Sequence, residues 1–152
     1  GYVTSSTFEL LLEAGFSYDS SLMGHDVRPY WCRLNDQWVK NEGVEWGEEV
    51  DLVELPWAWH LDDFPWFEYI PPQGGNLTAP SAVLETWLGD LDWALAHEPG
   101  GVLTYTMHPQ VIGRGNRMLM LEQLLDEVEK RGVGFTTLED AATNWRAAHP
   151  FS

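Results

Sequence analysis

The sequence predicts an α/β fold in which short strands alternate with helices. Short runs of β-prone residues, such as 102–106, are followed by segments in which apolar residues recur at helical spacing, as in 117–131. Glycine and proline residues mark the boundaries between these segments. We expect about four strands, arranged as repeated β/α units around a parallel sheet or a barrel. Because a closed barrel of this type needs roughly eight strands and about 250 residues, we expect the chain to form the second half of one.

Length and composition indicate one globular domain over residues 1–152, with 44% hydrophobic and 21% charged residues. The chain has 24 acidic and 8 basic residues, and its formal charge of −16 argues against nucleic acid and anionic membrane surfaces as partners. The single cysteine, Cys32, allows neither an internal disulfide nor a Cys-x-x-Cys zinc site, so we expect a partly buried, inert thiol. No apolar run approaches the ~20 residues that span a bilayer.

The first third of the chain is expected to contain one helix and one short strand. Ser6-Thr7-Phe8-Glu9 is a capping-box pattern, and leucine-rich spacing continues to Gly15, a residue suited to end a helix. Residues 16–21 predict a short strand and a turn. Residues 23–47 predict a long loop that contains Tyr30 and three of the nine tryptophans. Tryptophans in loops favour a site that stacks on a flat or ring-shaped ligand, and the alternative is that they fill a large core.

The middle of the chain predicts one strand and one long helix. Residues 50–56 alternate apolar and acidic side chains before a proline, which is typical of a strand that ends at a rim. Residues 71–77 contain proline, glycine and asparagine and predict a loop. A helix is expected from about 78 to 97, closed by Pro99-Gly100-Gly101.

The last third predicts two further β/α pairs. A strand over 102–106 precedes a helix over 117–131, which Gly132 ends. A last short strand is expected over 133–136. Thr137 is placed to cap a final helix whose first turn is acidic, as the positive end of a helix dipole favours.

His108 is the strongest candidate for chemistry. It follows the predicted strand 102–106, and the carboxyl ends of such strands form the rim where substrates bind in α/β folds. Pro109 holds the local backbone extended. An imidazole at this position can protonate a leaving group or stabilise an oxyanion, because its unperturbed pKa of about 6.5 lies near working pH. The alternative is a structural histidine with one hydrogen bond, and the position at a strand end favours the catalytic role.

Two acidic residues and one arginine are further candidates. Asp62 and Asp63 lie at the predicted end of another strand, among aromatic residues. One of these carboxylates could orient His108 and hold it protonated, or it could cap a helix or turn. Arg114 stands between two glycines and could clamp a carbonyl or carboxylate of a ligand, or tie its loop to a carboxylate of the fold.

The histidines give no metal motif that is complete in this chain. They stand at positions 25, 60, 97, 108 and 149, so no pair has the i, i+4 spacing that places two imidazoles on one helix face. We therefore predict no metal-ligating residues within residues 1–152.

Four stretches that keep their order over nearly the whole chain carry a family resemblance. The most specific is Thr106-Met107-His108-Pro109-Gln110-x-x-Gly113-Arg114-Gly115-x-Arg117-Met118; the others are Leu10–Met23, Arg28-Pro29-Tyr30-Trp31, and Leu55-Pro56 with Trp59-x-x-Asp62-Asp63. Together they resemble the polysaccharide deacetylase family, the NodB-homology or carbohydrate esterase 4-like group. Within it, they are most similar to the branch of peptidoglycan-deacetylase-like proteins, metal-independent allantoinases and cyclic imidases.

The resemblance implies an irregular β/α barrel of which this chain is the C-terminal half. It also implies that an Asp and two His in the first half, outside this chain, bind a divalent metal such as zinc, and that a second Asp there is the base. His108 matches the histidine that protonates the departing nitrogen, and Asp62 or Asp63 matches the carboxylate that orients it. The resemblance further implies that aromatic residues line the substrate groove: Tyr30, Trp59, Trp66 and Phe67.

We therefore expect the parent protein to be a hydrolase of non-peptide carbon–nitrogen bonds, in N-acetyl sugars or in a cyclic amide, imide or ureide. This chain alone is expected to be inactive. The alternative is a non-catalytic barrel that binds a carbohydrate or a ring compound. Because a half-barrel leaves a sheet edge and an apolar face uncovered, we expect a complementing chain, the missing N-terminal half, or a homo-oligomer. The chain begins at Gly1 without a methionine, so we expect this start to be internal to a longer polypeptide, and we expect a cytoplasmic location.

Overall fold

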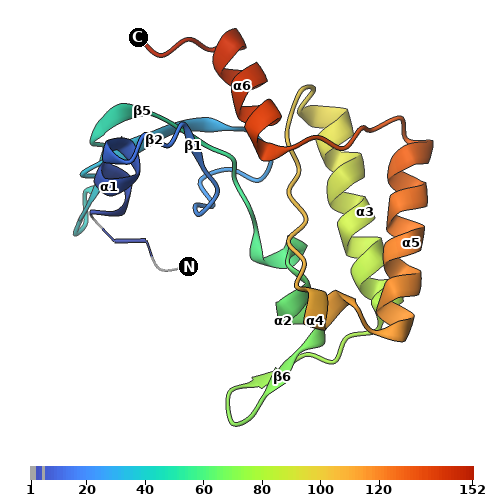
Figure 1. Cartoon of the computed structure of the whole chain (residues 1–152). Helices are drawn as coiled ribbons and strands as arrows, with labels where there is room; N and C mark the ends of the chain where they lie inside the picture. Colours follow the sequence, from blue (N-terminus) through green and yellow to red (C-terminus); the bar gives the residue numbers. More distant parts are fainter. Residues whose placement is uncertain (1–2, 5) are drawn as a thin grey trace. The chain divides into compact units, whose positions relative to one another are not determined.

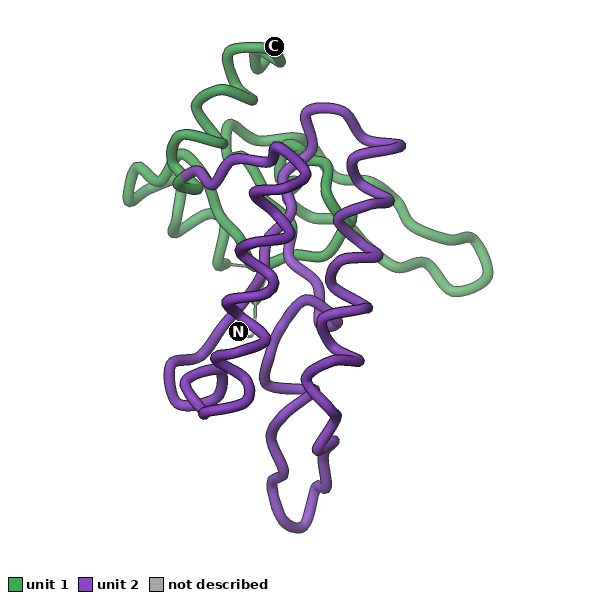
Figure 2. The backbone as a smooth tube through the Cα atoms, turned by 90° about the vertical axis from the view of Figure 1, so that its right-hand side faces the viewer, with its two compact units in different colours: residues 1–56, 137–152 green, residues 57–136 purple. Residues whose placement is uncertain are grey.

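The structure, a computed structural model, describes residues 3, 4 and 6–152 and divides into two compact units. Unit 1 comprises residues 1–56 and 137–152, and unit 2 comprises residues 57–136 (Figure 2). The chain therefore enters unit 2 after Pro56 and returns to unit 1 at Thr137. The single domain expected over residues 1–152 stays a prediction.

Unit 1 is built on a three-stranded mixed sheet with the order β1-β5-β2. The strand β5 (Glu48–Glu54) lies in the middle, parallel to β1 (Tyr18–Asp19) and antiparallel to β2 (Tyr30–Leu34) (Figure 1). The predicted strands at 16–21 and 50–56 are thus confirmed, with shifted ends. Glu54, the last residue of β5, pairs in register with both Asp19 and Tyr30.

The long loop expected over residues 23–47 is wrong. This region contains β2 and a hairpin of β3 (Gln37–Val39) and β4 (Gly43–Glu45), which forms a separate two-stranded sheet. Strands of three residues are too short to show an alternating pattern, and scattered aromatic residues obscure it further. The turn between them is formed by Asn41 and Gly43, whose φ angles of 68° and 98° lie in the left-handed region.

Two helices complete unit 1 and agree with the predicted positions. Helix α1 (Thr7–Glu13) ends at Gly15, whose φ is 77°, and the Phe16 N–H donates to the Leu11 carbonyl. The expected capping box is absent, because the Ser6 side chain makes no capping hydrogen bond. Helix α6 (Leu138–Ala148) begins as predicted, with the Asp140 N–H donating to the Thr137 hydroxyl. Cys32 is fully buried and packs in a core with Phe8 and Leu52.

Unit 2 consists of two long helices that pack together and several short elements. Helices α3 (Pro80–His97) and α5 (Gly115–Lys130) lie side by side (Figures 1 and 2). The predicted helices at 78–97 and 117–131 are confirmed. The remaining elements of unit 2 are a 3₁₀-helix η1 (Trp59–Leu61), helices α2 (Asp63–Phe67) and α4 (Pro109–Ile112), and a hairpin of β6 (Tyr69–Ile70) and β7 (Gly74–Gly75).

The core of unit 2 joins the two long helices to the segment that carries the candidate site. Trp87, from α3, is fully buried, and its indole N–H donates to the His60 carbonyl at 2.8 Å. The Trp66 indole donates to the same carbonyl at 2.9 Å. The other buried residues of this core are Ala58, Leu61, Phe67, Val83, Leu91, Val111, Ile112, Met120, Leu124 and Val128.

The strands expected over 102–106 and 133–136 are not formed in the structure, and the described residues form no barrel. Segment 102–106 is paired only by a parallel bridge between Thr106 and Asp62, and residues 133–136 have no strand neighbour among residues 3, 4 and 6–152. A strand requires a hydrogen-bonded neighbour, and a β/α barrel supplies neighbours from strands throughout its length. The observed architecture is mixed α/β.

Among the described residues, none of the helices combines the length and the apolar character that a membrane-spanning segment requires.

Two glycine substitutions should have opposite effects on folding. A methyl group at Gly47 would meet the Leu34 carbonyl in the backbone, whereas a methyl group at Gly89, inside α3, would meet no atom within 4 Å. We expect Gly47→Ala to lower the free energy of unfolding by about 2 kcal/mol or more. Gly89→Ala should raise it by about 0.5–1 kcal/mol, because alanine favours the helix. Urea denaturation measures both, and a stable Gly47→Ala protein would contradict the described packing at β2.

Candidate active site

Two segments of unit 2 that are distant in sequence bring the candidate residues together. The Thr106 N–H donates to the Leu61 carbonyl at 2.9 Å, and the Asp63 N–H donates to the Thr106 carbonyl at 3.0 Å. This short parallel bridge fixes the backbone of Asp62 and Asp63 beside the segment that ends at His108. Pro109 begins α4 directly after His108, whose own backbone is extended. His108 therefore lies at the point where an extended segment turns into a helix.

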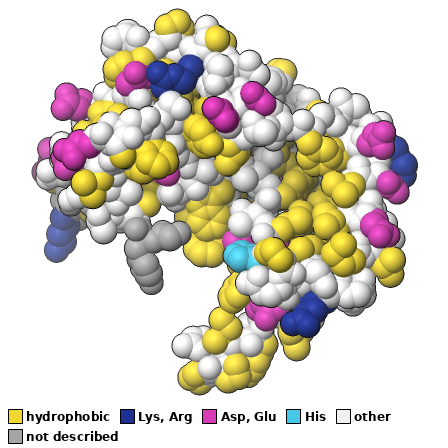
Figure 3. Space-filling model, in the orientation of Figure 1, with side chains coloured by type: hydrophobic (Ala, Val, Ile, Leu, Met, Phe, Trp, Pro, Cys, Tyr) yellow, Lys and Arg dark blue, Asp and Glu magenta, His cyan; other side chains and the backbone are white. Residues whose placement is uncertain are grey.

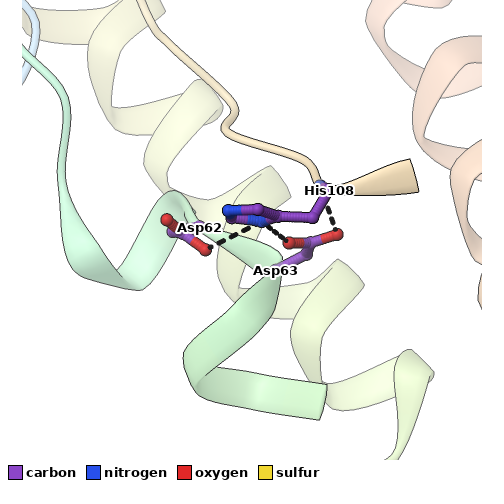
Figure 4. Close-up of side chains that lie close together, drawn as sticks. All are labelled: Asp62, Asp63 and His108. Carbon is purple, nitrogen blue, oxygen red and sulfur yellow. Dashed lines mark hydrogen bonds and ion pairs between the residues drawn. The ribbon is translucent and has the colours of Figure 1, made fainter. Parts of the chain in front are cut away.

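The buried Asp63 side chain binds His108 at both its backbone and its ring. The Asp63 Oδ2 accepts from the His108 backbone N–H at 3.0 Å, and Oδ1 lies 2.7 Å from the ring Nδ1 (Figure 4). Asp63 is fully buried, whereas 37% of the His108 side chain is exposed. This pair of contacts fixes the orientation of the ring. The other ring nitrogen, Nε2, points away from Asp63 (Figure 4).

Asp62 has a different task from Asp63. Its Oδ1 accepts from the Phe64 N–H at 2.8 Å and so caps the N-terminus of α2. The same oxygen lies 3.8 Å from His108 Nδ1, too far for a hydrogen bond but close enough for charge attraction. The two roles considered for this pair, helix cap and histidine partner, are thus divided between neighbouring residues.

The electrostatics of the cluster favour a protonated His108. The hydrogen bond to Asp63 raises the pKa of His108 above its ordinary value, and the charge of Asp62 adds to this effect, against a smaller opposing contribution from burial. Burial raises the pKa of Asp62, although the Phe64 N–H and His108 oppose this shift. Because the folded-state pKa of His108 is raised, its ion pair stabilises the fold fully below the unfolded-state pKa. That stabilisation is lost as pH rises through the folded-state pKa.

The aromatic residues expected at the site have different surroundings in unit 2. Trp59 is 57% exposed and meets the Trp57 ring edge-to-face, with ring centroids 4.6 Å apart. Trp66 is half-buried, and Phe67 belongs to the core. Phe64, which the sequence did not single out, lies with its ring 5.7 Å from that of His108. In the sequence, the only indication that Phe64 lies near His108 is that it directly follows Asp62 and Asp63.

The two arginines near His108 have different surroundings. Arg114 is exposed at the start of α5, and its side chain makes no hydrogen bond or ion pair within the part of the chain that the structure describes. Arg117 instead ties the elements together: it donates to the carbonyls of Val111 and Phe67, each at 2.8 Å, and pairs with Glu68 at 3.1 Å. The sequence placed Arg117 in the most specific stretch but gave it no role.

Tyr30, the remaining predicted substrate residue, belongs to unit 1. It lies on β2, and its hydroxyl accepts from the Gly24 N–H at 3.0 Å. Burial raises the pKa of Tyr30 to about 12. Contact of Tyr30, Trp59, Trp66, Phe67 or Arg114 with a substrate stays a prediction.

The cluster also has a donor set that could hold a divalent metal, which the sequence reasoning missed by considering only histidine pairs. One ligand atom each from Asp62, Asp63 and His108 lie within 4.8 Å of one another. An imidazole and two carboxylates suit zinc chemically. A metal bound through Nδ1 would replace the hydrogen bond between that nitrogen and Asp63.

Comparison with known proteins identifies relatives over nearly the whole chain. A peptidoglycan deacetylase of Helicobacter pylori is 34% identical over 157 aligned residues, which cover 95% of this chain and 54% of that protein. A peptidoglycan deacetylase-like protein of Gibberella zeae is 24% identical, over 92% of this chain and 47% of that protein. The chain thus spans about half the length of the curated relatives it matches. No family model matches the sequence.

Two solved structures also match nearly the whole chain. The crystal structure of a proposed polysaccharide deacetylase from Mycobacterium smegmatis matches with a TM-score of 0.74 and 30% identity, over 97% of this chain and 47% of that one. The structure of Puue allantoinase matches with a TM-score of 0.75 over 100% of this chain and 46% of that one. At 24% identity the second match shows the fold alone.

Replacing Asp63 should lower the pKa of His108. Asp63→Asn keeps the side chain's size but removes the charge that favours the imidazolium. Histidine signals in an NMR titration should show that the His108 pKa is lower in this variant than in the wild type. Asp92→Asn is the matched control, because Asp92 pairs with Arg131 rather than with a histidine. An unchanged His108 titration in Asp63→Asn would contradict the Asp63–His108 contact.

Proposed function

The chain belongs to the polysaccharide deacetylase family, and from this premise we propose that the protein carrying it hydrolyses a non-peptide carbon–nitrogen bond. The substrate class is an N-acetylated sugar or a cyclic amide, imide or ureide. The peptidoglycan deacetylase among the matched proteins supports the N-acetylated sugar, and the cyclic substrates rest on the family resemblance of the sequence. The observation that carries the proposal is the pairing of His108 with the buried carboxylate of Asp63.

In this mechanism, His108 is the general acid. With Nδ1 held by Asp63, the proton that can be transferred is the one on Nε2. Water adds to the carbonyl carbon, the carbon–nitrogen bond breaks, and the departing nitrogen takes the proton from Nε2. The proton released by the attacking water restores the imidazolium. An amine is a poor leaving group until it is protonated, so this transfer is required for the bond to break.

Asp63 acts through His108. It fixes the tautomer by accepting from Nδ1 and raises the pKa of the ring, as the carboxylate partner of a catalytic histidine does. Asp62 supplies a second negative charge and holds the start of α2 in place. In unit 2, Trp59 and Trp66 would contact the substrate, with Arg114 as a further contact, and the substrate contacts expected of Tyr30 and Phe67 stay predictions.

Activation of water belongs to the part of the protein outside this chain. The family resemblance assigns a divalent metal and a carboxylate base to the first half of the barrel, and a bound metal would polarise the carbonyl and the water. Asp62, Asp63 and His108 could also hold a metal, and we assign them to the acid role because their contacts already form that pair. The expected cytoplasmic location stays a prediction.

We also propose that unit 2 requires a covering partner, which is the missing half of the barrel or a further copy of the chain. Hydrophobic side chains gather on the visible face of this unit (Figure 3). Exposed large apolar residues of unit 2 include Trp59, Leu77, Leu119, Leu125 and Phe135. A wet apolar surface of this kind favours association.

Substitution of the proposed acid should abolish hydrolysis in the full-length protein. We expect His108→Gln to lower kcat by about 100-fold or more on an N-acetylated sugar oligomer or a cyclic imide, whichever the wild type hydrolyses. His60→Gln is the matched control, because His60 pairs with Asp90 and has no assigned part in the reaction. Hydrolysis by His108→Gln at the wild-type rate would refute the acid role, and a wild-type protein that only binds these compounds would favour a non-catalytic barrel.

The pH dependence of activity should show whether Asp63 acts on the pKa of His108 or only supports the fold. The reaction needs His108 protonated, so activity should fall as pH rises through the raised pKa of His108. In Asp63→Asn that fall should move to lower pH, by about the same shift as the NMR titration gives. A reduced rate with an unmoved pH profile would show that Asp63 supports the fold only.

Association can be tested on the isolated chain. We expect sedimentation to show self-association of residues 1–152 that disappears when the first half of the protein is supplied as a second chain. A monomer at high dilution that unfolds cooperatively would contradict the requirement for a partner.

A further inference from the structure

The β3–β4 hairpin of unit 1 carries two exposed tryptophans. In the register of the hairpin, Trp38 lies opposite Val44, so these two side chains share one face of the two-stranded ribbon. Trp46 directly follows β4 and lies at the base of the hairpin. Within it, Trp38 is 80% exposed and Trp46 is 69% exposed.

These two rings contribute little to the stability of the fold. The core of unit 1 consists of Phe8, Cys32 and Leu52 with the residues packed against them, and it includes neither tryptophan. An indole that stays in water loses the free energy that its burial would supply. Two exposed indole rings on one short hairpin form the kind of apolar surface that indicates a binding site.

The base of the hairpin is fixed by a network around Arg33. The Arg33 guanidinium donates to Glu49 at 2.8 Å and to the Gly47 carbonyl at 2.6 Å. The same guanidinium lies over the Trp46 ring, 5.6 Å from its centroid. The Gly47 N–H donates to the Asp36 side chain at 2.6 Å, and this hydrogen bond connects the two ends of the hairpin. The network holds Trp46 in place before any ligand arrives, so binding need not order it.

The charge around the hairpin is strongly negative. Residues 36–49 contain one lysine and five acidic side chains, all five exposed: Asp36, Glu42, Glu45, Glu48 and Glu49. Figure 3 shows acidic side chains beside hydrophobic ones on the visible face of unit 1. Carboxylates accept hydrogen bonds from hydroxyl groups and attract ammonium groups, and they repel polyanions.

We propose that the β3–β4 hairpin is a glycan-binding platform for oligosaccharides that contain glucosamine. The apolar C–H faces of the sugar rings pack on Trp38 and Trp46, and the sugar ammonium groups meet the surrounding carboxylates. The proposal rests in part on the proposed function, because removal of N-acetyl groups from a glycan produces such ammonium groups. The hairpin would bind a glycan chain from which some of the acetyl groups have already been removed.

The test is a titration of the full-length protein with a glucosamine oligomer, which carries no acetyl group for the enzyme to remove. We expect Trp38→Ala and Trp46→Ala each to weaken binding by about fivefold, and the double variant by about tenfold or more. Trp93→Ala is the matched control, because Trp93 is 45% exposed on α3 and belongs to unit 2. Raising the salt concentration should weaken binding of the wild type.

Three results would overturn the platform. One is unchanged affinity in the Trp38→Ala/Trp46→Ala protein, and another is an equal loss in Trp93→Ala. A linear polyamine serves as the control for charge alone, and tryptophan-dependent binding of the polyamine as tight as that of the sugar would also overturn it. Substitution of the two tryptophans by phenylalanine should restore part of the affinity, because a smaller aromatic face remains.

Failure of the platform and failure of the proposed function can be told apart. Loss of oligomer binding in the tryptophan variants of a protein that hydrolyses no acetylated sugar or imide would support the platform and refute the hydrolase. Hydrolysis of a monomeric N-acetylated substrate by a protein whose tryptophan variants bind the oligomer normally would refute the platform alone. The His108→Gln protein should still bind the glucosamine oligomer.

Discussion

A carboxylate that has been removed completely from water must be compensated by hydrogen bonds or by an opposite charge, and in unit 2 Asp63 has both from one residue. His108 supplies a backbone N–H and a ring nitrogen to the two oxygens of Asp63. Loss of the His108 ring would leave the buried Asp63 carboxylate with one hydrogen bond fewer, which destabilises the fold. The orientation of the ring and the path of the chain before α4 depend on this contact, whereas Asp62 caps the start of α2.

The same contact favours the acid role that we propose for His108 over the role of a base. The negative charge at Nδ1 favours the imidazolium, so the ring carries a transferable proton above the pH at which a free histidine would lose it. Exposure of the ring leaves Nε2 accessible, while burial of Asp63 keeps water from competing for Nδ1. A single buried carboxylate therefore sets the orientation, the tautomer and the protonation state of His108.

Sequence reasoning succeeded where local patterns decide structure and failed where distant pairing does. Helices α3, α5 and α6 follow from apolar spacing and from caps such as Thr137, which act within a few residues. The segments 102–106 and 133–136 have β-prone residues, but in the part of the chain that the structure describes the first is paired by one bridge between Thr106 and Asp62 and the second is not assigned as a strand. A local sequence pattern does not show this. His108 and its carboxylate partner could be predicted from residue type and position, whereas the division of labour between Asp62 and Asp63 required coordinates.

Under the proposed mechanism, the described residues supply only one of the groups that hydrolysis requires, and they form no closed barrel. An acid that protonates a departing nitrogen accelerates hydrolysis only if water is activated on the carbonyl at the same time, and His108, Asp62 and Asp63 account for the first task alone. The chain likewise spans about half the length of its curated relatives, and among the residues that the structure describes two segments expected as strands are not assigned as strands. Both observations have one physical explanation if the absent half of the barrel supplies the neighbouring strands together with the groups that activate water. The pre-formed Asp63–His108 pair would then be the part of the active site that this half can build without the other.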